Sequence, residues 1–209
     1  MFFRCGFVGA MALTTFAQGN ILVNGDFENM PNFGAGINRD PGYTLLTGTD
    51  IPNWTIVDGY GATVHNTVLY PTISGNFSIN TDGEGYNGHN INMYQDFATS
   101  ANQAYELKFD WKNWYEASTP LLRISVEDAA TNSVVVEGYY GILAGLHSET
   151  LNFVGTGGAL RVRISHSPES GYNDNTFIVD NFAVEAVPAP GAAGLLSLGA
   201  LAAGRRRRR

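Results

Sequence analysis

The chain has 209 residues, of which 44% are hydrophobic, 12% aromatic and only 15% charged. This length suits one domain with short flanking segments, and the apolar content is sufficient for a hydrophobic core. A disordered chain would need fewer apolar and more charged residues, so the composition excludes intrinsic disorder. The low charge and the 25 glycines are typical of a β protein rich in loops.

The charge is distributed unevenly along the chain. Arg4 and the run Arg205 to Arg209 are six of the twelve basic residues. The chain between them therefore holds six basic and all nineteen acidic residues, a formal charge of −13. Such a domain repels phosphate-rich polymers, which excludes nucleic acid as a partner, whereas neutral polar ligands and cations stay compatible with it.

Residues 1–17 have the pattern of a signal peptide. Arg4 precedes an apolar run over residues 7–16, and Thr15 and Ala17 supply small residues at the −3 and −1 positions of a cleavage site. We therefore predict export and removal of residues 1–17 by signal peptidase. Cys5, the one cysteine of the sequence, would leave with them. This excludes thiol catalysis and zinc–thiolate sites from the mature protein.

The C-terminal residues have three parts. Val187-Pro188-Ala189-Pro190 precedes an apolar stretch over residues 191–204, and Arg205 to Arg209 follow. A helix over those fourteen apolar residues would be about 21 Å long, shorter than a hydrocarbon core of about 30 Å. Arginines remain on the cytoplasmic side of a membrane, so we expect the preceding domain to lie outside the cytoplasm.

This tail over residues 187–209 resembles the PEP-CTERM sorting signal of bacteria, in which the first part is usually Val-Pro-Glu-Pro, so that Ala189 replaces a glutamate. The resemblance implies transient insertion into the inner membrane and recognition by an exosortase. It also implies a final location at the cell surface or in an extracellular matrix that contains exopolysaccharide. A plain single-pass membrane anchor is the alternative interpretation.

Between Asn20 and Glu185 we predict no helix. Runs of alternating or β-branched residues recur instead, separated by turns rich in glycine and proline. The predicted strands are 21–23, 54–57, 62–70, 77–80, 91–97, 105–114, 122–127, 133–137, 149–154, 160–166 and 177–184. This pattern predicts one all-β domain over residues 20–185, a jelly-roll sandwich of two sheets.

Four short motifs follow one another in this domain. They are Asn24-Gly25-Asp26-Phe27-Glu28, Ile51-Pro52-Asn53-Trp54, Tyr94-Gln95-Asp96-Phe97 followed by Tyr105 to Phe109, and Val179-Asp180-Asn181-Phe182-Ala183-Val184. Taken in this order they resemble galactose-binding-like jelly rolls, which include bacterial carbohydrate-binding modules. The resemblance covers residues 20–185 and implies a jelly-roll fold that binds polysaccharide.

In many members of this fold a structural calcium ion lies between the first and last strands. The resemblance places Glu28 and Asp180 at that position, and Asp26 is a further candidate ligand. Carboxylate oxygens are hard ligands suited to Ca²⁺, and a domain with a formal charge of −13 favours a bound cation. We therefore expect one structural Ca²⁺. The alternative is that Asp26 and Glu28 cap turns at a solvated edge.

Aromatic residues are the candidates for stacking on sugar rings, with neighbouring polar side chains binding the hydroxyl groups. Trp54 and Trp111 fall on the apolar side of alternating strands, which predicts core positions. The residues that we predict to bind a ligand interrupt such patterns or lie in Gly- and Asn-rich segments: Asn113, Trp114, Tyr115, Tyr86 and Tyr172. For Tyr139 and Tyr140 the sequence leaves open a binding platform or the core.

The sequence contains no motif that supports catalysis. It has no Gly-x-Ser-x-Gly elbow, no histidine pair at a metal-ligand spacing and no Gly-rich loop that opens a helix. We therefore predict a non-catalytic exported protein that binds a polysaccharide of the cell surface or matrix. The alternative is a structural matrix protein that acts through protein–protein contacts without a glycan site.

Overall fold

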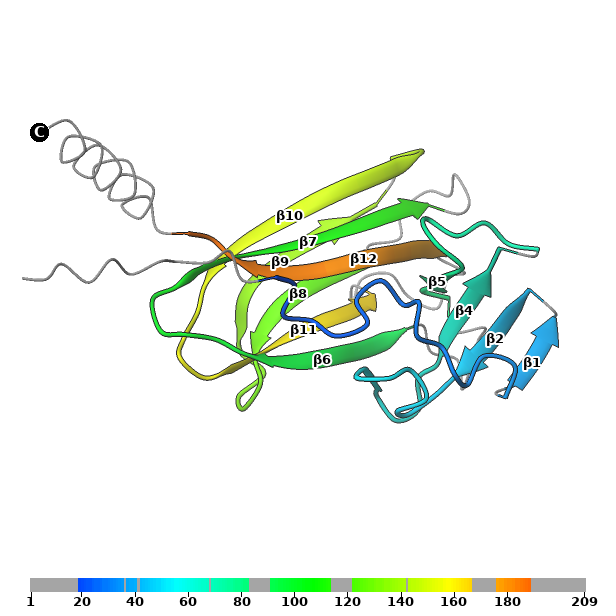
Figure 1. Cartoon of the computed structure of the whole chain (residues 1–209), viewed down its shortest axis with the longest axis horizontal. Helices are drawn as coiled ribbons and strands as arrows, with labels where there is room; N and C mark the ends of the chain where they lie inside the picture. Colours follow the sequence, from blue (N-terminus) through cyan, green and yellow to red (C-terminus); the bar gives the residue numbers. More distant parts are fainter. Residues whose placement is uncertain are drawn as a thin grey trace, which may run out of the picture.

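In the part of the chain that the structure describes, twelve strands form two antiparallel sheets that face each other across a hydrophobic core (Figure 1). This computed structural model describes residues 19–35, 37–40, 42–67, 69–82, 91–113, 122–141, 143–166 and 176–188. The arrangement confirms the prediction of an all-β jelly-roll sandwich.

One sheet has seven strands and the other has five. The order in the first is β1 (Ile37–Asp40), β2 (Tyr43–Leu46), β4 (Ala62–Asn66), β5 (Phe77–Asn80), β12 (Phe177–Ala186), β7 (Ala104–Asn113) and β10 (Leu146–Val154). The order in the second is β3 (Thr55–Ile56), β6 (Asn92–Ala98), β11 (Ala159–His166), β8 (Leu122–Asp128) and β9 (Val134–Tyr140). The last strands of the two sheets, β10 and β9, lie next to each other.

Alternation along the long strands directs one set of side chains into the core. On β7 the inward residues Tyr105, Leu107, Phe109 and Trp111 are at most 3% exposed, and the residues between them are more exposed. Trp54 is equally buried. The core positions predicted for Trp54 and Trp111 are therefore confirmed.

Three details of the strand prediction are wrong. Residues 21–23 form no strand because Val23 donates its backbone N–H to the side chain of Gln95 and Asn24 then turns the chain with a φ of 56°. The predicted strand 62–70 ends at Asn66. Strands β1 and β2 were not predicted, since β1 has one apolar residue in four and β2 is buried over three consecutive residues, so neither alternates.

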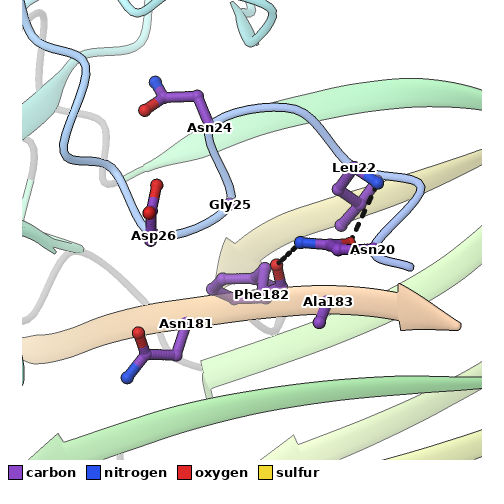
Figure 2. A pocket seen from close by; sticks show the side chains of 8 residues that line it. All are labelled: Asn20, Leu22, Asn24, Gly25, Asp26, Asn181, Phe182 and Ala183. Atoms are coloured by element: carbon purple, nitrogen blue, oxygen red, sulfur yellow. Dashed lines mark hydrogen bonds between the residues drawn. The ribbon is translucent and has the colours of Figure 1, made fainter.

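The segment from Asn20 to Asp26 takes the place of a strand beside β12, and Figure 2 shows it arching above that strand. The backbone N–H of Ile21 donates to the carbonyl of Val184 at 2.9 Å, and that of Phe182 donates to the carbonyl of Gly25 at 2.8 Å. The side chain of Asn20 donates to the carbonyl of Phe182 and accepts from the N–H of Val184. These bonds satisfy the bulged part of β12, where the pairing with β7 is irregular.

An aromatic cluster lies directly beneath this segment. The ring of Phe27 is 5.3 Å from that of Trp54 and 6.0 Å from that of Phe182, and Phe182 stacks on Phe109 at 5.3 Å. The indole N–H of Trp54 donates to the carbonyl of Asn24 at 3.0 Å. All four motifs found in the sequence therefore meet here, and these aromatic residues serve packing.

The ends of the chain are described only in part. Among the described residues no helix is long and apolar enough to span a membrane. The predicted signal peptide, the apolar stretch 191–204 and Arg205 to Arg209 lie outside them, as do Ala189 and Pro190. Val187 donates its N–H to the carbonyl of Ala104 at 2.9 Å, so the predicted Val187–Pro190 motif begins on the domain itself.

Replacement of Gly25 should destabilise the domain strongly, because an added Cβ would lie 2.0 Å from the carbonyl oxygen of Phe182. We expect Gly25→Ala to lower the free energy of unfolding by about 2–3 kcal/mol, as overpacking does, in urea denaturation followed by circular dichroism. Gly19→Ala is the matched control, since its Cβ would meet no atom within 4 Å. Equal midpoints for the two variants would contradict this account of the first motif.

Candidate functional site

The aromatic residues predicted to bind sugar fall mostly outside the described residues: Trp114, Tyr115, Tyr86 and Tyr172. Asn113 is described and ends β7 directly opposite Phe177. The residues that flank the three segments 83–90, 114–121 and 167–175 lie together, because Thr81 bonds both Phe177 and His166. The described residues that flank these three segments therefore lie at one end of the sandwich, and the binding role of the segments stays a prediction.

The two carboxylates predicted to bind calcium both contact the turn over residues 73–78. Glu28 accepts hydrogen bonds from the N–H groups of Asn76 and Phe77 and from the side-chain amide of Asn76, at 2.8–3.1 Å. Asp180 is fully buried and accepts from the hydroxyl groups of Ser74 and Ser78. It also accepts from the N–H groups of residues 74 and 181.

The third predicted ligand, Asp26, lies elsewhere. It lines a pocket of about 330 Å³ between the N-terminal segment and β12, together with Asn20, Asn24 and Asn181 (Figure 2). No group of three or more His, Cys, Asp or Glu that could hold a metal ion occurs in the described part of the chain. N–H and O–H donors already occupy the oxygens of Glu28 and Asp180, so the fit to Ca²⁺ is poor. No observation here tests calcium binding directly, and it stays a prediction.

The pocket in Figure 2 offers few unoccupied polar groups. Asn24 uses its side chain to bond the backbone of Asn29 and Pro52. Asn20 bonds the backbone of β12, and Asn181 donates its amide to Asp110 at 2.7 Å. These asparagine side chains hold the N-terminal segment in place.

The outer face of the five-stranded sheet carries a different kind of surface. Its side chains point away from the core because Met93, Ile124, Val162 and their alternating neighbours point into it. We call it the polar face, and it consists of Asn92, Tyr94, Asp96, Arg123, Ser125, Glu127, Glu137, Tyr139, Arg161 and Arg163. It holds three of the six basic residues between Arg4 and Arg205 and only three of the nineteen acidic residues.

Four of these charged residues form one network, and Arg161 pairs separately with Asp96 at 2.7 Å. Glu127 is the centre of the network and accepts from Arg123 at 3.0 Å and from Arg163 at 2.8 Å. Arg123 also bonds Glu137 at 2.7 Å, and Arg163 donates to the amide oxygen of Asn92 at 2.8 Å. Every cation of the polar face is thus paired with a carboxylate, and the face is neutral as a whole.

The side chains at the centre of this network are largely buried, which restricts their orientations. The side chain of Glu127 is 5% exposed and those of Arg123 and Arg163 are each 15% exposed. Burial alone would raise the pKa of Glu127, but hydrogen bonds from Arg163 and Ser125 outweigh it and hold that pKa below its usual value. The carboxylate therefore stays ionised and keeps both guanidinium groups oriented.

Tyr94 and Tyr139 differ in how much of their rings the charged side chains cover. The guanidinium of Arg161 lies 3.8 Å from the ring centre of Tyr94 and makes a bidentate pair with Asp96. Tyr139 is 47% exposed and lies on β9 directly opposite Arg123. Tyr140 packs against the core. The sequence left open whether Tyr139 and Tyr140 lie at the surface or in the core, and the structure places Tyr139 at the surface and Tyr140 against the core.

The polar face brings together groups that suit a neutral sugar chain. An exposed aromatic ring offers a surface for the C–H face of a sugar, and paired guanidinium and carboxylate groups offer oriented donors and acceptors for hydroxyl groups. No motif in the sequence marks these charged residues as a group. Their alternation along 122–127 was visible, but their grouping across four strands follows from the register.

Comparisons with known proteins bear on the fold. No protein-family profile matches the chain, and no curated protein matches it. An arabinose-bound family 51 α-L-arabinofuranosidase is similar in structure, with a TM-score of 0.51 and 10% identity over 80% of this chain. This chain spans 26% of the length of that enzyme.

Two smaller proteins match over nearly their whole length. A family 16 carbohydrate-binding module has a TM-score of 0.46 and 17% identity, covering 79% of this chain and 99% of the module. The module TmCBM61, solved with β-1,4-galactotriose, has a TM-score of 0.44 and 14% identity, covering 79% and 97%. At such identities the likeness concerns the fold alone.

Asp180 should make the stability of the domain depend on pH. Its burial raises its pKa to about 6, although bonds from Ser78, Asn181 and Ser74 oppose this. The folded state thus favours the protonated form, and the contribution of Asp180 to the free energy of unfolding is largest below pH 3.8 and is lost as pH rises through about 6. The loss is about 3 kcal/mol at most.

Burial acts in the opposite sense on His65 and His166, whose pKa values it lowers to about 4. Their contribution is full above pH 6.5 and is lost as pH falls towards 4. Since Asp180 and the two histidines act in opposite directions, we expect Asp180→Asn to change how the free energy of unfolding depends on pH. In urea titrations, the unfolding free energy of wild type relative to Asp180→Asn should fall between pH 4 and pH 8. Parallel profiles for the two proteins would contradict the assignment.

Proposed function

We propose that this protein binds a neutral polysaccharide on the polar face of its five-stranded sheet and acts as a non-catalytic binding module. The observation that carries the proposal is the exposed ring of Tyr139 beside the ion-paired side chains of Arg123 and Glu137. A sugar ring stacked on Tyr139 would place its hydroxyl groups against these two side chains.

The charge balance of the face sets the class of polymer. Because each guanidinium already has a carboxylate partner, an acidic sugar would have to displace Glu127, Glu137 or Asp96. The formal charge of −13 between Arg4 and Arg205 also repels anionic polymers. A neutral chain needs no such displacement and is not repelled.

The size of the face suits a polymer. Its residues lie on the four strands from β6 to β9, and three inter-strand spacings of about 4.8 Å give a width of about 14 Å. Asp96 on β6 and Glu137 on β9 lie at the two sides of the face, and their side chains are 45% and 34% exposed. Several sugar units in a row would therefore meet polar groups along the path.

The location that we propose for this activity follows from the two ends of the sequence. Residues 1–17 would direct export, and the Val187–Pro190 motif with residues 191–209 would hold the protein transiently in the inner membrane until an exosortase releases it. The binding domain would then lie at the cell surface or in the extracellular matrix, where polysaccharide is available.

Affinity electrophoresis through gels that contain polysaccharides tests the proposal, with neutral and uronic-acid polymers compared. We expect a neutral polymer to retard the wild-type protein, and Tyr139→Ala to weaken the binding about tenfold through loss of the stacking surface. Leu69→Ala is the control, because Leu69 is 57% exposed and lies in the turn after β4, away from the polar face.

Two outcomes would contradict this placement. Retardation that Trp114→Ala abolishes and Tyr139→Ala leaves intact would move the site to the end of the sandwich where Asn113 lies. No retardation by any neutral polymer, including the exopolysaccharide of the producing cells, would leave the structural alternative as the better account.

A further inference from the structure

Exposed apolar side chains concentrate along one side of the sandwich. In the described part of the chain, six of the eight large hydrophobic residues that are most exposed fall between residues 134 and 154: Val134, Val135, Tyr139, Leu143, Leu146 and Val154. They lie on β9, on β10 and on the connection between these strands. Tyr139 and Val134, which lies opposite Glu127, are on the outer face of the five-stranded sheet, and the others mark the side where both sheets end.

Strand β10 is a long edge. It has nine residues and pairs with β7 on one side, whereas no described strand pairs with its other side. Natural proteins protect such edges with lysine, proline, bulges, short strands or inward-pointing charges, and of these β10 has one acidic residue on its inner face, Glu149. β10 contains no lysine, arginine or proline, and its register with β7 runs through all nine positions without a bulge.

The side chains on the outer face of β10 are symmetric in chemical type. They are Leu146, Ser148, Thr150, Asn152 and Val154, and all five are exposed. Read from either end, the order is apolar, polar, threonine, polar, apolar. A strand with this pattern is complementary to a second copy of itself that runs in the opposite direction.

We propose that two copies of this chain associate through β10, antiparallel, about a twofold axis at Thr150. Leu146 of each copy then lies opposite Val154 of the other, and Ser148 opposite Asn152. The two Thr150 residues face each other, a cross-strand pair that stabilises antiparallel strands. The two seven-stranded sheets become one continuous sheet.

The inner face of β10 selects the same register. With the axis at Thr150, Glu149 lies opposite Leu151 of the other copy and His147 opposite Phe153, so no like charges meet. An axis at Glu149 would set two carboxylates opposite each other, which is unfavourable. An axis at Leu151 would set Ser148 opposite Val154. Thr150 is therefore the centre that the sequence of β10 favours.

A second copy suits this edge better than another partner, because the contact is isologous and both sides need the same complementary pattern. The outer row carries no charge, although the domain as a whole carries −13. The remaining acidic residues repel across distances that salt screens, with a Debye length of about 10 Å at 0.1 M. Association should therefore strengthen as salt is added.

The dimer leaves the polar face open in both copies, since it joins the seven-stranded sheets and the polar face belongs to the other sheet. Two faces held in one particle would bind a polymer with higher avidity than one. The dimer itself does not depend on the proposed polysaccharide binding, because it rests on β10 alone.

Cysteine cross-linking in the full chain tests the register, on a background in which Cys5 is replaced by serine. Thr150→Cys places two thiols opposite each other at the axis, whereas Asn152→Cys places them about 14 Å apart along the strands. A disulfide needs Cα atoms about 4.4–6.8 Å apart, so we expect Thr150→Cys to form at least about ten times more covalent dimer under mild oxidation.

A mixture of Ser148→Cys and Asn152→Cys chains gives the second arm, because these positions face each other only across the axis. The mixture should cross-link, and each variant alone should not. Equal yields for Thr150→Cys and Asn152→Cys, or no product from either, would overturn the proposal.

Sedimentation velocity of the full chain in non-ionic detergent gives a readout without cross-links. Thr150→Lys sets two ammonium groups opposite each other and should weaken the dimer at least about tenfold, while the β-type circular dichroism spectrum stays unchanged because the position is exposed. The dimer of the unsubstituted chain should strengthen with salt. A monomer at every salt concentration would overturn the proposal, and glycan retardation of that monomer would show that only the dimer had failed.

Discussion

The close approach of Gly25 to β12 is the constraint on which the rest of this domain depends. The absence of a side chain lets the backbone of Gly25 accept from Phe182, whose own carbonyl receives the amide of Asn20. This contact closes the N-terminal segment over the bulge of β12 and brings Phe27 onto Trp54. One packed cluster thus contains residues from the start of the domain, Phe27, and from its last strand, Phe182.

Because that cluster uses the aromatic residues of the motifs for packing, the polysaccharide binding that we propose relies on other side chains. Trp54 and Phe27 are almost fully buried, and the polar residues around them bond the backbone. The acids near the cluster behave in the same way: Glu28 and Asp180 hold the turn over residues 73–78. The motifs therefore explain the fold, and the surface that we propose for binding lies on the other sheet.

The two surfaces that we assign to function use different physical properties of the sandwich. The polar face draws on buried ion pairs, in which Glu127 orients Arg123 and Arg163. The free edge of β10 draws on unpaired backbone groups and an uncharged outer row. Since they lie on different sheets, binding at one does not obstruct the other, and a protein that both holds polysaccharide and joins to its copies would suit an extracellular matrix.

The amino-acid sequence by itself determined the all-β class, the two-sheet sandwich and the burial of Trp54 and Trp111, because alternation along a strand is a local property that burial on one face imposes. It did not reveal β1 and β2, whose residues do not alternate. Nor could it assemble the polar face or distinguish Tyr139 from Tyr140. Only the register between strands, set by packing of residues distant in the chain, decided which charges meet and which edge stays open.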